Sequence, residues 1–251
     1  DLAELSPRIT SEIIAYSHEG RPIVGLTITS EGNHARLDEI KAAHVALSDP
    51  ASGQQVLDDM PVVTWLNYGV HGAEVSSTDS SMAVAYHLAA AQGQEIEQTL
   101  DSSVIILIGV FNPDGNSRES AWNHMHGGNV AVTDTSHRLH NTFWPGGRTN
   151  HYWFDLNRQW LLVQHPGPQG WVAKFHEWRP NITVDYHEMG SNSTYYFHPG
   201  APDRTFPYIP DRSMELLDQV SDRARSFLDR EQRLYFNEEN YDNYYIGKGS
   251  T

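Results

Sequence analysis

The chain has 251 residues, of which 39% are hydrophobic and 20% charged, a composition typical of a globular protein with a substantial core. Acidic residues outnumber basic ones by 32 to 17, and the net charge of -15 argues against binding to the phosphate backbone of nucleic acid. The sequence contains no cysteine, which excludes thiol nucleophiles, thiolate metal sites and disulfides, so any metal ion must be held by His, Asp or Glu.

The N-terminal part of the sequence predicts a β-hairpin and then a segment of undecided type. IIAYSHEGRPIVGLTITS indicates two short strands around a turn at Glu19 and Gly20. HARLDEIKAAHVALSDP is compatible with either a helix or a strand. PVVTWLNYGV then predicts a buried strand, which is bounded by Pro61 and by the glycines at 69 and 72.

A helix and a second buried strand follow. SSTDSSMAVAYHLAAAQG predicts a helix with Ser or Thr caps, with Met82 and Tyr86 among the residues at helical spacing, and with an end near Gly93. The apolar stretch SVIILIGVF is far shorter than the roughly 20 residues that span a bilayer, and its length fits a buried strand. It runs into an Asn-Pro-Asp-Gly turn, and from there to residue 158 no period is visible, which predicts a long loop that is either functional or disordered.

The rest of the chain continues the alternation of helices and strands. PQGWVAKFHEWRP predicts a helix that stops before Pro180, NITVDYHEMGS a strand, and RSMELLDQVSDRARSFLDR an amphipathic helix. This order predicts an α/β fold in which helices cover both faces of a mixed, largely parallel central sheet. We expect a single domain over residues 1–251.

Polar clusters follow three of the predicted strands: HGAE at 71–74, NPDG at 112–115 and DYHEMGS at 185–191. Ligands of open α/β sheets bind beyond the carboxyl ends of the strands, so these clusters are expected to converge. His71 and Glu74 could grip one ion, and His187 could supply a third ligand. Two imidazoles and a carboxylate form a catalytic zinc site, although each residue taken alone has an ordinary structural interpretation.

Three cationic or amide side chains indicate a substrate site. FDLNRQW places Asn157 beside Arg158, a pair suited to bidentate capture of a carboxylate, with a structural pair between Arg158 and Asp155 as the alternative. Arg118, three residues past the NPDG turn, could face the same crevice and stabilise an oxyanion. A solvated loop arginine is the alternative for Arg118.

The order H-x-x-E, N-P-D-G, D-x-N-R and a strand ending in His resembles the zinc carboxypeptidase family, typified by pancreatic carboxypeptidases A and B. SHEGRPIVGLTI resembles the opening hairpin of that family, and the likeness runs from about residue 15 to the end of the chain. The resemblance implies a zinc carboxypeptidase-like α/β/α fold and one Zn²⁺ ion. It also implies an enzyme that uses metal-activated water to remove C-terminal residues from peptides with a free terminal carboxylate.

The resemblance also implies roles for individual residues. The zinc ligands would be His71, Glu74 and His187. Asn157 and Arg158 would hold the terminal carboxylate of the substrate, and Arg118 would polarise the scissile carbonyl.

YYIGKGST resembles the segment with the mobile active-site tyrosine of the family, with Tyr244 as the better match and Tyr245 as the rival. Thr251 would lie near the side-chain pocket. The general-base glutamate of the family lies on a later strand, so we expect the native protein to continue past Thr251, and this piece to bind metal while being incomplete as a catalyst. Glu188 would point to the opposite face of its strand from His187, so it is not assigned as the base.

Two other functions stay open. Related zinc amidohydrolases share the H-x-x-E and D-x-N-R patterns, so a deacylase of small N-acyl amino acids is one, and a peptide-binding module without catalysis is the other. An acidic chain without cysteine or an initial Met suits a periplasmic or secreted enzyme, and a cytoplasmic one also fits.

Overall fold

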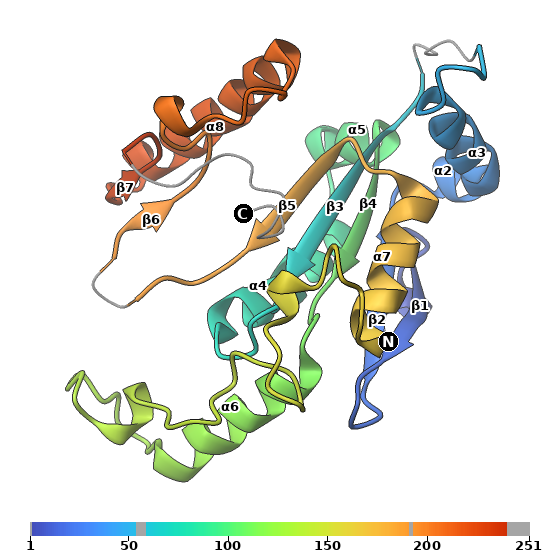
Figure 1. Ribbon diagram of the computed structural model, residues 1–251. Coiled ribbons are helices and arrows are strands. Elements are labelled where there is room, and N and C mark those ends of the chain that lie inside the picture. Colours follow the sequence, from blue (N-terminus) through green and yellow to red (C-terminus); the bar gives the residue numbers. More distant parts are fainter. Residues whose placement is uncertain (1, 54–58, 191–192, 240–251) are drawn as a thin grey trace. The chain divides into compact units, whose positions relative to one another are not determined.

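The computed structural model describes residues 2–53, 59–190 and 193–239, and the chain divides into two compact units, Asp1–Glu188 and Met189–Thr251 (Figure 1). The single zinc carboxypeptidase-like domain over residues 1–251 stays a prediction. None of the described helices combines the length and the hydrophobicity needed to cross a membrane. The compartment likewise stays a prediction.

A mixed sheet forms the centre of the first unit, and its described strands follow the order β1-β2-β4-β3-β5 (Figure 1). The strands are β1 (Ile9–Tyr16), β2 (Pro22–Ile28), β3 (Val62–Tyr68), β4 (Ser103–Ile108) and β5 (Ile182–Tyr186). β3 pairs in parallel with β4 and β5, whereas β2 is antiparallel to both β1 and β4. Of these strands only β2 points against the others, which confirms the predicted mixed, largely parallel sheet.

Helices cover both faces of this sheet. The helices of the first unit are α1 (Leu2–Leu5), α2 (Glu31–His34), α3 (Leu37–Leu47), α4 (Val75–Ala90), α5 (Gln94–Asp101), α6 (Pro113–His126) and α7 (Pro166–Trp178). Two short 3₁₀ turns, η1 (Arg138–His140) and η2 (Leu156–Arg158), lie in the segment between α6 and α7. The undecided segment near residue 40 is therefore a helix, α3.

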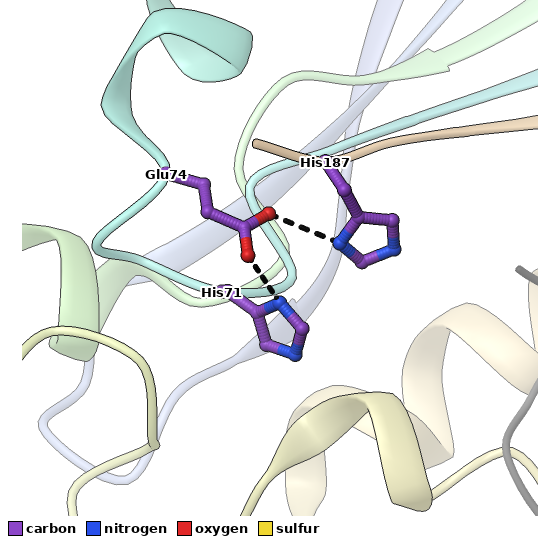
Figure 2. Close-up of side chains that lie close together, drawn as sticks. All are labelled: His71, Glu74 and His187. Carbon is purple, nitrogen blue, oxygen red and sulfur yellow. Dashed lines mark hydrogen bonds and ion pairs between the residues drawn. The ribbon is translucent and has the colours of Figure 1, made fainter. Parts of the chain in front are cut away.

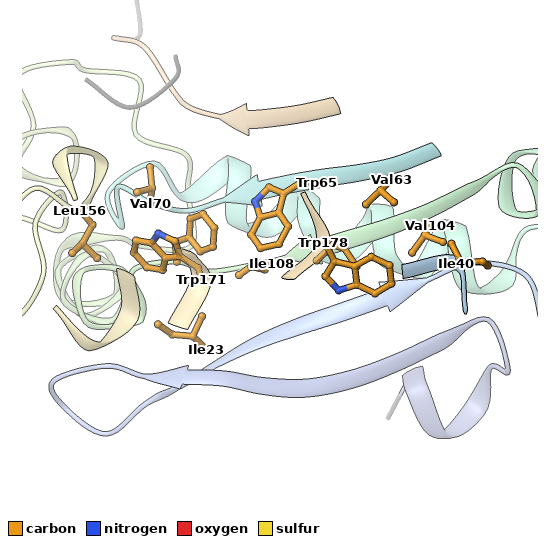
Figure 3. Close-up of a cluster of buried hydrophobic side chains, with 12 residues drawn as sticks. Ile23, Ile40, Val63, Trp65, Val70, Val104, Ile108, Leu156, Trp171 and Trp178 are labelled. Atoms are coloured by element: carbon orange, nitrogen blue, oxygen red, sulfur yellow. The ribbon is translucent and has the colours of Figure 1, made fainter. Parts of the chain in front are cut away.

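Two hydrophobic cores lie on opposite faces of the sheet, because side chains alternate along its buried strands. Trp65 of β3 packs on one face with Trp171 and Trp178 of α7 (Figure 3). Tyr68 of β3 packs on the other face with Leu88 of α4. This packing on both faces fixes the position of β3, including its carboxyl end.

The structure corrects two details of the predicted helices. The NPDG sequence starts α6 rather than a turn and a long loop, since Asn112 accepts a hydrogen bond from Gly115 N and Pro113 occupies the first turn. In α4 the residues at helical spacing do not form one buried face, because Met82 and Tyr86 are exposed. Small residues of α4, among them Ser81, are buried against the sheet instead.

The second unit contains the predicted amphipathic helix as α8 (Asp211–Arg230). Its described part also contains the 3₁₀ turn η3 (Pro202–Arg204) and two short parallel strands, β6 (Tyr195–Tyr196) and β7 (Tyr235–Phe236). Ser221 of α8 donates to the carbonyl of His198, and the rings of Tyr196 and Phe236 lie 5.2 Å apart. These contacts tie the helix and the strands into one unit.

Two glycines bring the loops at the carboxyl edge of the large sheet together. A Cβ atom on Gly72, after β3, would lie 2.1 Å from the backbone nitrogen of Asn116. On Gly115, in the first turn of α6, it would lie 2.2 Å from the carbonyl oxygen of Gly147. Only glycine permits such close backbone approach, so these residues hold the loop after β3 against α6 and against residues 146–150.

We predict that Gly72→Ala destabilises the protein by about 1–3 kcal/mol, because the added methyl group would overlap backbone atoms that cannot rotate away. Urea unfolding followed by circular dichroism would measure the change. Gly128→Ala is the matched control, since a Cβ there meets no atom within 4 Å and the backbone is not left-handed. Equal stability of the two variants would contradict the packing argument.

Candidate metal centre

His71, Glu74 and His187 meet at the carboxyl edge of the sheet. His71 and Glu74 lie in the loop between β3 and α4, and His187 directly follows β5. Because β3 and β5 are parallel neighbours with Tyr68 opposite Tyr186, their ends lie side by side. One ligand atom from each of the three side chains lies within 4.8 Å of the others. Sequence positions more than a hundred residues apart therefore form one group.

The carboxylate of Glu74 stands between the two imidazoles (Figure 2). Its Oε1 is 2.7 Å from His71 Nδ1, and its Oε2 is 3.0 Å from His187 Nδ1. Ligand atoms of a tetrahedral zinc site are about 3.4 Å apart, given metal–ligand bonds of about 2.1 Å. Small side-chain rotations would open these contacts around an ion, so the donor set and its spacing fit one zinc.

The far nitrogen of each imidazole is bonded to a further carboxylate. His71 Nε2 lies 3.1 Å from Asp155 Oδ1, and His187 Nε2 lies 2.8 Å from Asp185 Oδ2. Such partners fix the ring orientation and hold the proton on Nε2, so that Nδ1 is the nitrogen available to a metal. The two rings are thus oriented in the same way by two separate elements.

Burial and hydrogen bonding have opposite effects on the ionisation of His71, Glu74 and His187. Burial raises the pKa of Glu74, but the hydrogen bonds with His187 and His71 outweigh it and lower the pKa to about 2. Burial lowers the pKa of His187, yet its bonds with Asp185 and Glu74 raise it to about 10. The pKa of His71 is also raised, since Asp155 and Glu74 outweigh burial there. The carboxylate is therefore ionised at neutral pH, and the imidazoles keep their protons to higher pH than free histidine.

Arg148 places a positive charge beside His71 and Glu74, and the sequence analysis did not identify it. Its Nη1 is 4.0 Å from Glu74 Oε1 and 3.5 Å from His71 Nδ1. Its Nε and Nη2 donate to Asp155 Oδ2 at 3.2 and 2.9 Å. Burial raises the pKa of Asp155, but His71 and Arg148 together hold it well below its usual range. The half-exposed guanidinium of Arg148 is thus anchored beside the group while still facing solvent.

Arg118 lies elsewhere than predicted. Its guanidinium donates to the carbonyls of Gly146, Thr149 and Asn150. None of the hydrogen bonds described for Arg118 reaches His71, Glu74 or His187. Arg118 therefore holds the backbone on both sides of Arg148 rather than facing the crevice.

Asn112, the N-cap residue of α6, and Glu119 within α6 also bind the segment around Arg148. Asn112 donates from Nδ2 to the carbonyl of Arg148 at 3.1 Å. The buried carboxylate of Glu119 accepts from Gly147 N at 3.1 Å and from Thr142 Oγ1 at 2.7 Å. The position of Arg148 is thus set by the helix that the NPDG sequence begins.

Of the two residues predicted to bind the substrate carboxylate, one is buried and the other is exposed. Asn157 is buried, and its Nδ2 lies 3.4 Å from His187 Nε2. Arg158 is exposed, and one of its nitrogens donates to the carbonyl of Asn157 at 3.0 Å. Asn157 therefore adjoins the metal group, and Arg158 stands outside it.

The remaining predicted residues differ in what can be described. Tyr244, its rival Tyr245 and Thr251 lie outside the described residues, so their roles stay predictions. Glu188 accepts a hydrogen bond from Ser76 N at the start of α4. A sequence signal existed for Asp185, which stands two residues before His187 and so on the same face of the strand.

The comparisons with known proteins agree with this geometry. Residues 1–209 match the zinc carboxypeptidase family, whose members use Zn²⁺. No curated protein matches the sequence.

Several solved carboxypeptidases share the fold at low sequence identity. Carboxypeptidase A from Helicoverpa armigera aligns with 14% identity and a TM-score of 0.60, covering 100% of this chain and 56% of its own. A metallo-carboxypeptidase from Pseudomonas aeruginosa, in complex with (2-guanidinoethylmercapto)succinic acid, aligns with 16% identity and a TM-score of 0.59, covering 99% of this chain and 52% of its own. This chain therefore spans about half the length of these structures. From the match over residues 1–209, it belongs to the zinc carboxypeptidase family.

Proposed function

We propose that the protein is a zinc-dependent metallocarboxypeptidase that removes C-terminal residues from peptides, with His71, Glu74 and His187 as the metal ligands. The observation that carries the proposal is the pair of imidazole Nδ1 atoms facing the carboxylate of Glu74. A zinc ion held there supplies a Lewis acid and a water of lowered pKa.

Arg148 supports the proposal as a cation that lies beside two of the proposed metal ligands, His71 and Glu74. Hydrolysis of a peptide places negative charge on the carbonyl oxygen, and a fixed guanidinium stabilises that charge without having to reorganise. The guanidinium of Arg148 donates to Asp155, and the backbone carbonyl of Arg148 accepts a hydrogen bond from the side-chain amide of Asn112. We therefore propose Arg148 for the role that the sequence analysis gave to Arg118.

Asn157 and Arg158 support binding of the terminal carboxylate. The Asn157 amide lies beside His187, and Arg158 follows it on the exposed side. An amide and a guanidinium can bind the two oxygens of one carboxylate, which here would require the exposed guanidinium of Arg158 to turn toward the buried amide of Asn157. Such binding would place the last peptide bond at the metal group, so the enzyme would remove single residues rather than cut internally.

A comparison of substrates tests the proposed reaction. The zinc-loaded full-length protein should release the last amino acid from an N-blocked dipeptide, and should leave the same dipeptide with a C-terminal amide intact. Liquid chromatography of the products would measure both. Preferential hydrolysis of N-acetyl amino acids would favour a deacylase, and binding of the peptide without release would favour a non-catalytic module.

We expect Asp185→Asn to weaken zinc binding by about 10–100-fold, because the amide no longer holds the proton of His187 Nε2 as a carboxylate does. Competition with a fluorescent chelator would measure the dissociation constant. Asp38→Asn serves as the control, since the side chain of Asp38 is fully exposed. Unchanged affinity in Asp185→Asn would contradict a ligand role for His187.

Zinc binding should depend on pH in a definite direction. The pKa of His187 is raised to about 10 and that of His71 is also raised, so zinc must displace protons from the imidazoles near neutral pH. We expect release of roughly one to two protons per zinc near pH 7, and an affinity that rises as the pH increases. Calorimetry in two buffers of different ionisation enthalpy would count the protons. Binding without proton release would show that zinc sits elsewhere.

A further inference from the structure

Helix α4 starts at the metal group without a cap from its own sequence. Glu74 is its N-cap residue but makes no side-chain hydrogen bond to the helix, and the first turn contains no acidic residue. The carboxylate of Glu74 turns to His71 and His187 instead. The first N–H groups of a helix need acceptors, so one must come from elsewhere.

Glu188, the residue after His187, supplies that acceptor. Its carboxylate accepts a hydrogen bond from Ser76 N, in the first turn of α4, and negative charge is favourable there. In return, the N–H of Glu188 donates to Glu74 Oε2 at 2.9 Å. Glu188 thus accepts from the second residue of α4 and donates to its N-cap residue, an arrangement similar to a capping box, except that Glu188 lies 112 residues after Ser76 in the sequence.

We propose that Glu188 is a positioning residue for the metal group: it caps α4 so that the carboxylate of Glu74 stays available to the ion. This inference rests on the proposed metal site. Side chains at an N-cap normally accept from the second or third residue of the helix, and Ser76 is the second residue of α4. Without Glu188, the uncapped N–H and the helix dipole would draw Glu74 away from the imidazoles.

Three substitutions separate this role from a general effect on folding. Glu188→Ala removes the acceptor, Glu188→Gln keeps an acceptor of the same length without the charge, and Glu188→Asp keeps the charge on a shorter side chain. We expect Glu188→Ala and Glu188→Asp to bind Zn²⁺ about 10–100-fold more weakly, and Glu188→Gln to bind nearly as well as the unmodified protein.

Two further measurements accompany the zinc affinities from chelator competition. The melting temperatures of the metal-free proteins show whether a variant loses stability, so that the zinc affinities are compared at a temperature at which every variant is folded. The visible absorption of bound Co²⁺ should change in Glu188→Ala, since the carboxylate leaves the ion. Glu95→Ala is the control: Glu95 lies in the first turn of α5, so the variant should bind metal like the unmodified protein.

The outcomes are distinct. Normal zinc affinity in Glu188→Ala, whatever its melting temperature, would overturn the inference while leaving the metal site intact. Equal loss of affinity in Glu188→Gln and Glu188→Ala would also overturn it, because charge rather than capping would then matter. If the unmodified protein binds no zinc, or if His187→Ala binds it equally well, the proposed metal site fails and the inference fails with it.

Discussion

The contact of one carboxylate with two imidazoles organises this end of the molecule. Glu74 interacts with His71 and His187 at the same time, although His187 lies 113 residues further along the chain. The parallel pairing of β3 and β5 makes the contact possible, since it brings two strand ends to one edge of the sheet. β3 packs in the hydrophobic clusters and β5 is paired with it along its length, so the ligands stand on ordered supports.

Opposite charges alternate outward from this contact. Arg148 binds Asp155, Asp155 faces His71, and on the other side His187 faces Asp185. Glu74 lies between the two imidazoles and Asp155 lies between His71 and Arg148, which lowers the pKa values of these two acids, and the pKa values of both histidines are raised. A divalent cation would replace the imidazole protons in this arrangement. The metal-free group is therefore already ordered in the way that a bound ion requires.

A good part of this could be predicted from the sequence. The five strands of the large sheet, the helices α4, α7 and α8, and the His-x-x-Glu pair follow from local patterns of hydrophobicity and from residues placed at strand ends. The sequence left α3 undecided between helix and strand, gave no indication of α5, and predicted a turn and a loop where α6 lies. Arg118 shows where such reasoning failed. Its distance from the NPDG sequence suggested a role at the crevice, but that sequence begins a helix, and the helix directs Arg118 to the carbonyls of residues 146–150. Spacing along the chain does not give the direction of a side chain until the local conformation is known.

The sequence by itself determined the chemical type of the site, because the absence of cysteine left only imidazole and carboxylate ligands, and because family motifs occur in a recognisable order. Only the tertiary structure decided which side chains support those ligands. Arg148 and Asp155 lie in an irregular segment with no periodic pattern, and Glu188 acts on a helix far from it in sequence. Their partners are brought near by strand pairing and by the close contacts of glycine backbones, which are properties of the folded chain and not of any local stretch of it.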